Sequence, residues 1–122
     1  MPCRIVICDD QAGFRQLISL VLGLEDGLEV VGEAQDGRAV VQVVADLSPD
    51  VLLLDIAMPE RDGIDALPEI RNASPGTSVV MLTAFASDIV RRRAMDAGAS
   101  GFIEKGADVD DLVAQIREAC QA

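Results

Sequence analysis

The sequence contains no histidine and only three cysteines, which limits the chemistry that the chain can perform. Without an imidazole it supplies neither a histidine base nor a phosphohistidine of its own. The cysteines, at positions 3, 8 and 120, are odd in number and form no C-x-x-C pair, so a zinc site is not expected. Each lies in or beside an apolar stretch. We interpret all three as small buried hydrophobic side chains.

Long apolar runs and an excess of basic residues are also missing. Half of the residues are hydrophobic, yet no run is long enough to span a bilayer. The first residues lead directly into a strand-like segment, without the pattern of a signal peptide. Ten basic residues against 21 acidic ones give a net charge of -11, which disfavours unaided nucleic-acid binding. We therefore expect one domain over residues 1–122, cytoplasmic and without membrane contact.

Five strand-like segments alternate with five helix-like segments. The expected strands are residues 4–8, 28–34, 51–55, 78–82 and 102–104, and the expected helices lie near residues 12–24, 36–47, 62–73, 87–97 and 108–120. The helices show apolar residues at intervals of three and four, as at Phe14, Leu17, Ile18, Val21 and Leu22. Strict alternation predicts an α/β fold, with a parallel sheet covered by helices on both faces.

The segment Val51–Asp55 holds the central position in this pattern. Four apolar residues run into one aspartate, as is typical of a strand buried on both faces. Pro59 cannot continue the hydrogen-bond ladder, so we expect the strand to end near Asp55. Ligands of open α/β sheets bind at the carboxyl ends of the strands. Asp55 is therefore the predicted reactive residue.

Other polar residues follow the remaining strands and should share this edge of the sheet. Asp9 and Asp10 follow the first strand, Thr83 ends the fourth, and Lys105 follows the fifth. Three carboxylates in one place repel one another unless a positive charge lies among them. Oxygen ligands and retained waters suit Mg²⁺ better than a transition metal. Asp55 would then act as a nucleophile towards phosphorus, with Lys105 and Thr83 binding phosphoryl oxygens.

Taken together, these motifs make nearly the whole chain resemble the receiver domain of two-component response regulators. The resemblance rests on Asp9-Asp10, on Asp55 with Met58-Pro59 and Asp62-Gly63 behind it, on Thr83-Ala84, and on the run from Phe102 to Lys105. It implies a flavodoxin-like (βα)5 doubly wound sandwich, whose five-stranded parallel sheet has the order 2-1-3-4-5. It also implies that Asp55 accepts a phosphoryl group from a sensor histidine kinase or a histidine phosphotransfer protein.

The resemblance also implies a role for each remaining residue of the site. Asp9, Asp10, Asp55 and the backbone carbonyl of Ala57 would hold Mg²⁺, and Lys105 would pair with the phosphate. Thr83 would move towards the phosphate and Phe102 would turn inward, so that the signal reaches the face made by the fourth helix, fifth strand and fifth helix. Two residues depart from the family pattern: Gly106 replaces the usual cis-proline, which suggests a looser loop or a trans bond, and Phe102 replaces the commoner tyrosine.

The output of such a switch is left open by the sequence. The stretch from Ala94 to Phe102 resembles the branch of the family that carries a C-terminal helix-turn-helix domain, which would allow transcription control and contact with DNA. The alternative is a free-standing receiver or phosphorelay intermediate that acts by protein–protein contact. A homodimer is compatible with either. The Arg91–Arg93 run is interpreted as a solvated helix face.

Three other functions fit these motifs less well than the switch does. A haloacid-dehalogenase-like phosphatase needs D-x-D after the first strand, and Asp9-Asp10 lacks that spacing. A nucleotide- or flavin-binding domain needs a glycine-rich phosphate loop there, which is absent. An adaptor that has lost phosphorylation would not need the complete set of residues. The expected activity is that of a phosphoacceptor with self-phosphorylation and self-dephosphorylation chemistry, not of an enzyme with a separate substrate.

Overall fold

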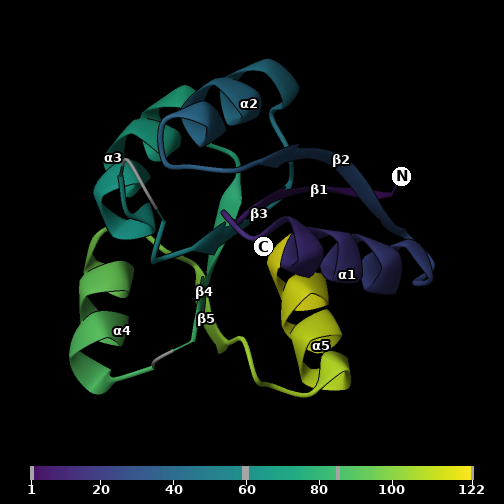
Figure 1. Cartoon of the computed structure of the whole chain (residues 1–122). Coiled ribbons are helices and arrows are strands. Elements are labelled where there is room, and N and C mark those ends of the chain that lie inside the picture. Colours follow the sequence, from purple (N-terminus) through teal and green to yellow (C-terminus); the bar gives the residue numbers. More distant parts are fainter. Residues whose placement is uncertain (1, 59–60, 85, 122) are drawn as a thin grey trace.

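A parallel sheet lies between two layers of helices in the computed structural model, which describes residues 2–58, 61–84 and 86–121 (Figure 1). The elements follow the chain in strict βα alternation: β1 Cys3–Cys8, α1 Ala12–Gly23, β2 Leu28–Ala34, α2 Ala39–Leu47, β3 Val51–Asp55, α3 Gly63–Ala73, β4 Ser78–Thr83, α4 Asp88–Asp96, β5 Gly101–Glu104 and α5 Val109–Cys120. The predicted strands and helices are confirmed, most of them to within a residue or two at each end.

The sheet has the strand order β2-β1-β3-β4-β5, and every pairing in it is parallel. This confirms the flavodoxin-like fold. β3 lies at the centre, and all five of its residues are buried. Since parallel strands share one direction, the carboxyl ends of β1, β3, β4 and β5 meet at one edge of the sheet. That edge is where the predicted site residues should gather.

Two hydrophobic cores cover the two faces of the sheet. Along β3 the side chains alternate between them: Leu52 and Leu54 pack with α2, α3 and α4, whereas Val51 and Leu53 pack with α1 and α5. Figure 1 shows the same division, with α2, α3 and α4 on one side of the strands and α1 and α5 on the other. Each helix buries one apolar stripe, as its periodicity predicted.

Side-chain caps fix where three of the helices begin. Asp62 accepts a hydrogen bond from the backbone N–H of Asp65 at the start of α3. Ser87 and Asp108 cap α4 and α5 in the same way. The capped starts of α3 and α5 follow the carboxyl ends of β3 and β5 in the chain. None of the described helices is long and apolar enough to span a membrane.

The cysteines correct one expectation. Cys8 is buried and free, as predicted, but Cys3 and Cys120 form a disulfide, with Cα atoms 5.9 Å apart. They are 117 positions apart in the sequence, so no local pattern signals the pair. The parallel fold brings them together because β1 begins, and α5 ends, at the edge opposite the carboxyl ends of the strands. Interpreting these two as isolated hydrophobic side chains was wrong.

Candidate functional site

Three carboxylates meet at the carboxyl end of β1 and β3. Oxygen atoms of Asp9, Asp10 and Asp55 all lie within 4.8 Å of one another. The side chains differ in depth, because Asp9 is 0 % and Asp55 3 % exposed whereas Asp10 is exposed. The cluster therefore has a buried floor and an open side. The prediction that these acids converge is confirmed.

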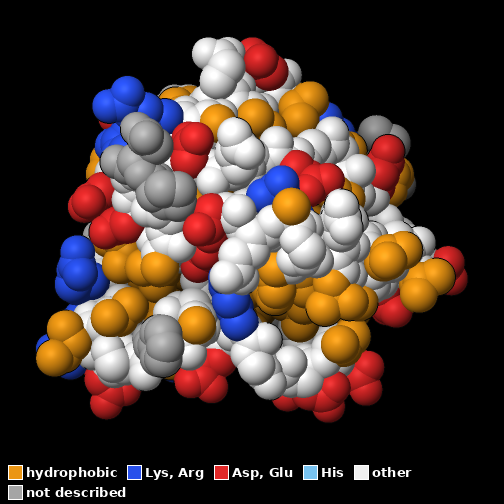
Figure 2. Space-filling view, in the orientation of Figure 1, with side chains coloured by type: hydrophobic (Ala, Val, Ile, Leu, Met, Phe, Trp, Pro, Cys, Tyr) orange, Lys and Arg blue, Asp and Glu red, His pale blue; other side chains and the backbone are white. Residues whose placement is uncertain are grey.

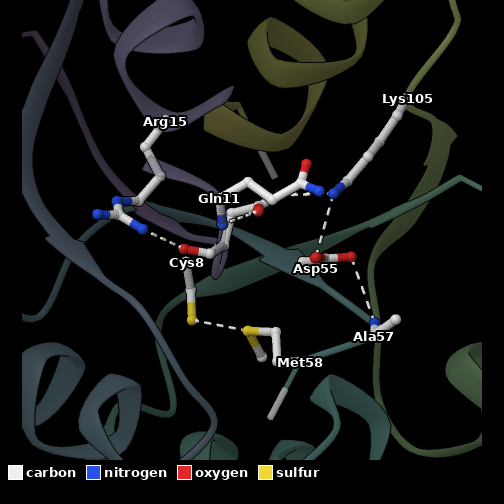
Figure 3. A network of polar contacts seen from close by, with 8 residues as sticks. Cys8, Gln11, Arg15, Asp55, Ala57, Met58 and Lys105 are labelled. Atoms are coloured by element: carbon white, nitrogen blue, oxygen red, sulfur yellow. Dashed lines mark hydrogen bonds and ion pairs between the residues drawn. The ribbon is translucent and has the colours of Figure 1, made fainter. Parts of the chain in front are cut away.

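Lys105 supplies the positive charge at this cluster (Figure 3). Its Nζ atom lies 2.7 Å from Oδ2 of Asp9 and 3.1 Å from Oδ2 of Asp55. The backbone N–H of Lys105 donates to the carbonyl of Thr83, at 2.8 Å, so the ends of β4 and β5 hold the lysine in place. One ammonium thus bridges two buried carboxylates and leaves the cluster with a net negative charge.

Burial and charge alter the acidity of these groups. Burial raises the pKa of Asp55 above its usual range, and the hydrogen bond from Lys105 opposes this only in part. Burial alone would lower the pKa of Lys105, but its hydrogen bonds to Asp9 and Asp55 and their charges outweigh that effect and raise it. The lysine therefore remains protonated at neutral pH, as a counter-ion must.

Backbone groups orient both buried carboxylates. The other oxygen of Asp55 accepts a hydrogen bond from the N–H of Ala57, at 3.3 Å. The other oxygen of Asp9 accepts from the N–H of Gln11, at 2.8 Å. Each carboxylate thus has one oxygen fixed by its own loop and one turned to Lys105. The two oxygens of each acid are distinguished before any ligand arrives.

Three residues that the sequence analysis did not place in the site contribute to this geometry. Phe14 lies beneath the lysine, with its ring centroid 4.7 Å from Nζ. Arg15 donates to the backbone carbonyl of Asp9 and pairs with Glu33 at 3.0 Å. Both belong to α1, whose apolar period was interpreted only as core packing. Their distance from Asp10 by about one helical turn is the only signal that the sequence offered.

Gly63 is the third of these residues. A Cβ atom at this position would lie 2.3 Å from the carbonyl oxygen of Asp55, too close for any side chain. Its N–H donates to the carbonyl of Ile56 at 2.8 Å, which folds the start of α3 back onto the end of β3. From the sequence, Asp62-Gly63 was interpreted only as a motif of the family resemblance and as the start of a helix. In the structure, the absence of a side chain at Gly63 also lets the start of α3 pack against the backbone of Asp55.

Thr83 and Phe102, the two expected switch residues, lie in β4 and β5. Thr83 ends β4 and is 7 % exposed. Phe102 pairs with Met81 in the sheet and is half-buried against the core of α2, α3 and α4. No cis peptide bond occurs among the described residues, so the bond from Lys105 to Gly106 is trans. Pro59, which marked the expected strand end, lies outside the described residues.

Comparisons with known proteins agree with this arrangement. The family described as the response regulator receiver domain matches residues 5–117. A protein-glutamate methylesterase/protein-glutamine glutaminase of Alkalilimnicola ehrlichii is 42 % identical over 99 % of this chain and 32 % of its own length. The transcriptional regulatory protein PdtaR of Mycobacterium tuberculosis is 39 % identical over 95 % of this chain and 56 % of its own. The chain thus spans between a third and about half of these relatives.

Solved structures show the same fold. The response regulator domain of Thermotoga maritima CheB superposes with a TM-score of 0.92 at 28 % identity, covering 100 % of this chain and 98 % of that one. The receiver domain of the putative response regulator NarL from Mycobacterium tuberculosis gives 0.93 at 30 % identity, covering 99 % and 98 %. The likeness extends over the whole domain, from β1 to α5.

Proposed function

This chain belongs to the response regulator receiver domain family, and we propose that Asp55 is its phosphoacceptor. The observation that carries the proposal is the position of this carboxylate: it is buried at the end of the central strand, within 3.1 Å of a lysine ammonium and beside two further acids. A nucleophile towards phosphorus needs an ionised oxygen and nearby positive charge to accept the phosphoryl oxygens. Asp55 has both.

The transfer joins an oxygen of Asp55 to phosphorus as the bond from phosphorus to the donor breaks. The electron pair of the broken bond stays on the leaving group, which is an imidazole nitrogen when the donor is a phosphohistidine. Because this chain has no histidine, such a donor belongs to another protein, a sensor kinase or a phosphotransfer protein. Lys105, which already bridges Asp9 and Asp55, would turn its ammonium to a phosphoryl oxygen.

The acidic cluster fits Mg²⁺. Asp9, Asp10 and Asp55 offer converging oxygen atoms, and the single ammonium of Lys105 cannot neutralise the charge of three carboxylates. We assign the ion to these three side chains and to the backbone carbonyl of Ala57. When bound, it would neutralise charge on the phosphoryl oxygens. Asp10, on the open side of the cluster, would be the ligand nearest to solvent.

The signal would leave the site through Thr83 and Phe102. The backbone carbonyl of Thr83 accepts a hydrogen bond from the N–H of Lys105, so a phosphoryl group at Asp55 would act on the ends of β4 and β5 together. Phe102 is half-buried in β5 and would turn inward in response. We propose that this motion alters the face formed by α4, β5 and α5, where partners or a second copy would bind.

The donor would approach over α1. Alone among the five helices, all of which are described, α1 has no acidic residue, although the chain carries a net charge of -11. Leu17, Leu20 and Leu24 are 56, 68 and 84 % exposed, at the spacing by which one helix packs against another. Figure 2 shows hydrophobic side chains gathered over the region of α1 and α5. Since α1 begins two residues after Asp10, a helical protein docked there would bring its phosphohistidine to Asp55.

Two outputs remain open for this switch. The similarity to PdtaR, named as a transcriptional regulatory protein, favours control of transcription. The similarity to a methylesterase shows that relatives of this chain also serve other outputs. The alternative that we retain is a receiver or phosphorelay intermediate that acts by protein contact alone.

Labelling with a small phosphodonor tests the assignment. With acetyl phosphate and Mg²⁺, the parent chain should gain an acid-stable, base-labile phosphoryl group, and EDTA should prevent it. Asp55→Asn should abolish the label. Asp46→Asn, on the exposed face of α2, is the matched control and should label like the parent. Labelling of Asp55→Asn at the parent's rate and extent would show that another residue is the acceptor.

A further inference from the structure

The two cysteines of the disulfide join the beginning and the end of the fold. Cys3 is the first residue of β1, and Cys120 is the last residue of α5. Both are half-buried. Asp9 follows the opposite end of β1, so the disulfide and the acidic cluster lie at opposite edges of the sheet. The sulfur pair therefore plays no part in the chemistry of Asp55.

Contacts other than the disulfide also hold the two cysteines next to each other. The N–H of Cys3 donates to the carbonyl of Gly27 at 2.8 Å. Arg117, one turn before Cys120, donates to the carbonyl of Asp26 at 3.0 Å and pairs with Glu25 at 3.2 Å. The turn between α1 and β2 thus binds both the start of β1 and the end of α5. The thiols would remain neighbours with the bond open, so closing it needs little rearrangement.

Reagents can reach this pair from solvent. A hollow of about 410 Å³ is lined by Cys3 and Cys120 together with Leu28, Asp50 and Arg117. The third cysteine differs in every respect. Cys8 is 0 % exposed and lies inside the core between the sheet and α2, α3 and α4. Reagents in solvent can therefore reach Cys3 and Cys120 but not the thiol of Cys8.

We propose that Cys3 and Cys120 are a reversible redox modification site, which reacts with low-molecular-weight disulfides of the glutathione type. One thiolate attacks the small disulfide, forms a mixed disulfide and releases one small thiol. The second thiolate then attacks the protein sulfur of the mixed disulfide and releases the other small thiol. The two cysteines lose two electrons and two protons, and one small disulfide is reduced to two thiols.

Oxidation at this site would fasten α5 to the sheet. α5 is otherwise held by the apolar side chains of Leu112, Val113 and Ile116, packed against the core that it shares with α1. The disulfide adds a covalent link at the end of the helix, where the Arg117 contacts and the partly buried Ala119 also hold the last turn. The redox state would thus set how readily the end of α5 separates from β1.

Thiol labelling of the native parent chain is the first test. The chain is equilibrated with mixtures of reduced and oxidised glutathione and alkylated with iodoacetamide without denaturant, and labels are counted by intact mass. We expect two labels in the reducing mixtures and none in the oxidising ones, with Cys8 unlabelled in both. After unfolding the counts should become three and one. Two labels at every ratio, or disulfide-linked dimers in place of the closed monomer, would overturn the proposal.

Variants and amide exchange complete the test. Cys120→Ser should keep a stable mixed disulfide with glutathione at Cys3, whereas the matched control Cys8→Ala should close like the parent. Asp55→Asn should also close, because the proposal does not depend on phosphorylation. Backbone amides in the last turn of α5 should exchange more slowly in the oxidised parent than in the reduced one. Equal exchange in the two states would remove the claim that oxidation fastens α5.

Discussion

Replacing Lys105 with methionine tests the electrostatic account of the site. Lys105 bridges Asp9 and Asp55, whose side chains are 0 and 4 % exposed, so its removal leaves two buried carboxylates without a counter-ion. Removing one partner of a buried ion pair costs about 3–5 kcal/mol. Because the lysine side chain is itself 16 % exposed, we take the lower end, a loss of about 3 kcal/mol in the free energy of unfolding without metal.

Mg²⁺ should reverse much of this loss. A ligand at a hundred times its dissociation constant stabilises the native state by about 2.7 kcal/mol. The ion should bind the Lys105→Met variant more tightly than the parent, since no ammonium competes for the carboxylates. The gap in stability between the two proteins should therefore narrow when Mg²⁺ replaces EDTA.

Urea unfolding at pH 7, in EDTA and in Mg²⁺, measures both effects. Arg61→Met is the matched control, because it removes a cation from the surface pair with Glu69, whose atoms are 2.7 Å apart. The two side chains are 26 and 57 % exposed and far less buried than Asp9 and Asp55, so loss of the pair should cost about 1 kcal/mol, independently of metal. The reasoning is refuted if Lys105→Met is as stable as the parent in EDTA, or if Mg²⁺ leaves the gap unchanged.

Three further predictions follow from the same geometry. The pKa of Asp55 is raised in the fold, so the stability that this side chain contributes is present below the ordinary pKa of 3.8 and is lost as pH rises through the folded pKa. In EDTA, the free energy of unfolding of Asp55→Asn relative to the parent should therefore increase from pH 4 to pH 7. Urea titrations that find no such trend would contradict this. Gly63→Ala should destabilise the fold by about 1–3 kcal/mol in urea unfolding and slow labelling by acetyl phosphate, because its Cβ meets the carbonyl of Asp55. Leu20→Glu should label normally from acetyl phosphate but lose labelling from a phosphorylated histidine phosphotransfer domain. The control Ile89→Glu, at an exposed residue of α4, should keep both kinds of labelling. Equal behaviour of the two variants would reject α1 as the docking face.

The fold was predictable because its signals are local and repeated. Each strand is a short apolar run and each helix an apolar stripe, and β3, buried along its whole length, stands out as the centre. The convergence of Asp9, Asp10 and Lys105 at Asp55 follows from one topological rule, that the ends of parallel strands share an edge. The residue types were read from the sequence, and their proximity followed from the parallel arrangement of the strands.

What the sequence did not predict depends on distances across the fold. The pairing of Cys3 with Cys120 joins residues 117 positions apart, and nothing near either cysteine marks it. Phe14 was assigned to the core by its helical period, although its ring lies under the ammonium of Lys105. Gly63 was interpreted only as part of a family motif at a helix start, because the approach of its backbone to Asp55 is visible only in three dimensions. In each case the residue type was correct for the local element, and the additional contact came from another segment.

Chemical trapping of the phosphoryl group tests the central claim most directly. After reaction with acetyl phosphate and Mg²⁺, borohydride reduces an acyl phosphate to an alcohol and so converts the modified aspartate to homoserine. Peptide mass spectrometry should find homoserine at position 55 and aspartate at positions 9 and 10. Homoserine at position 9 or 10, or a labelled protein that yields none, would contradict the assignment of Asp55 as the acceptor.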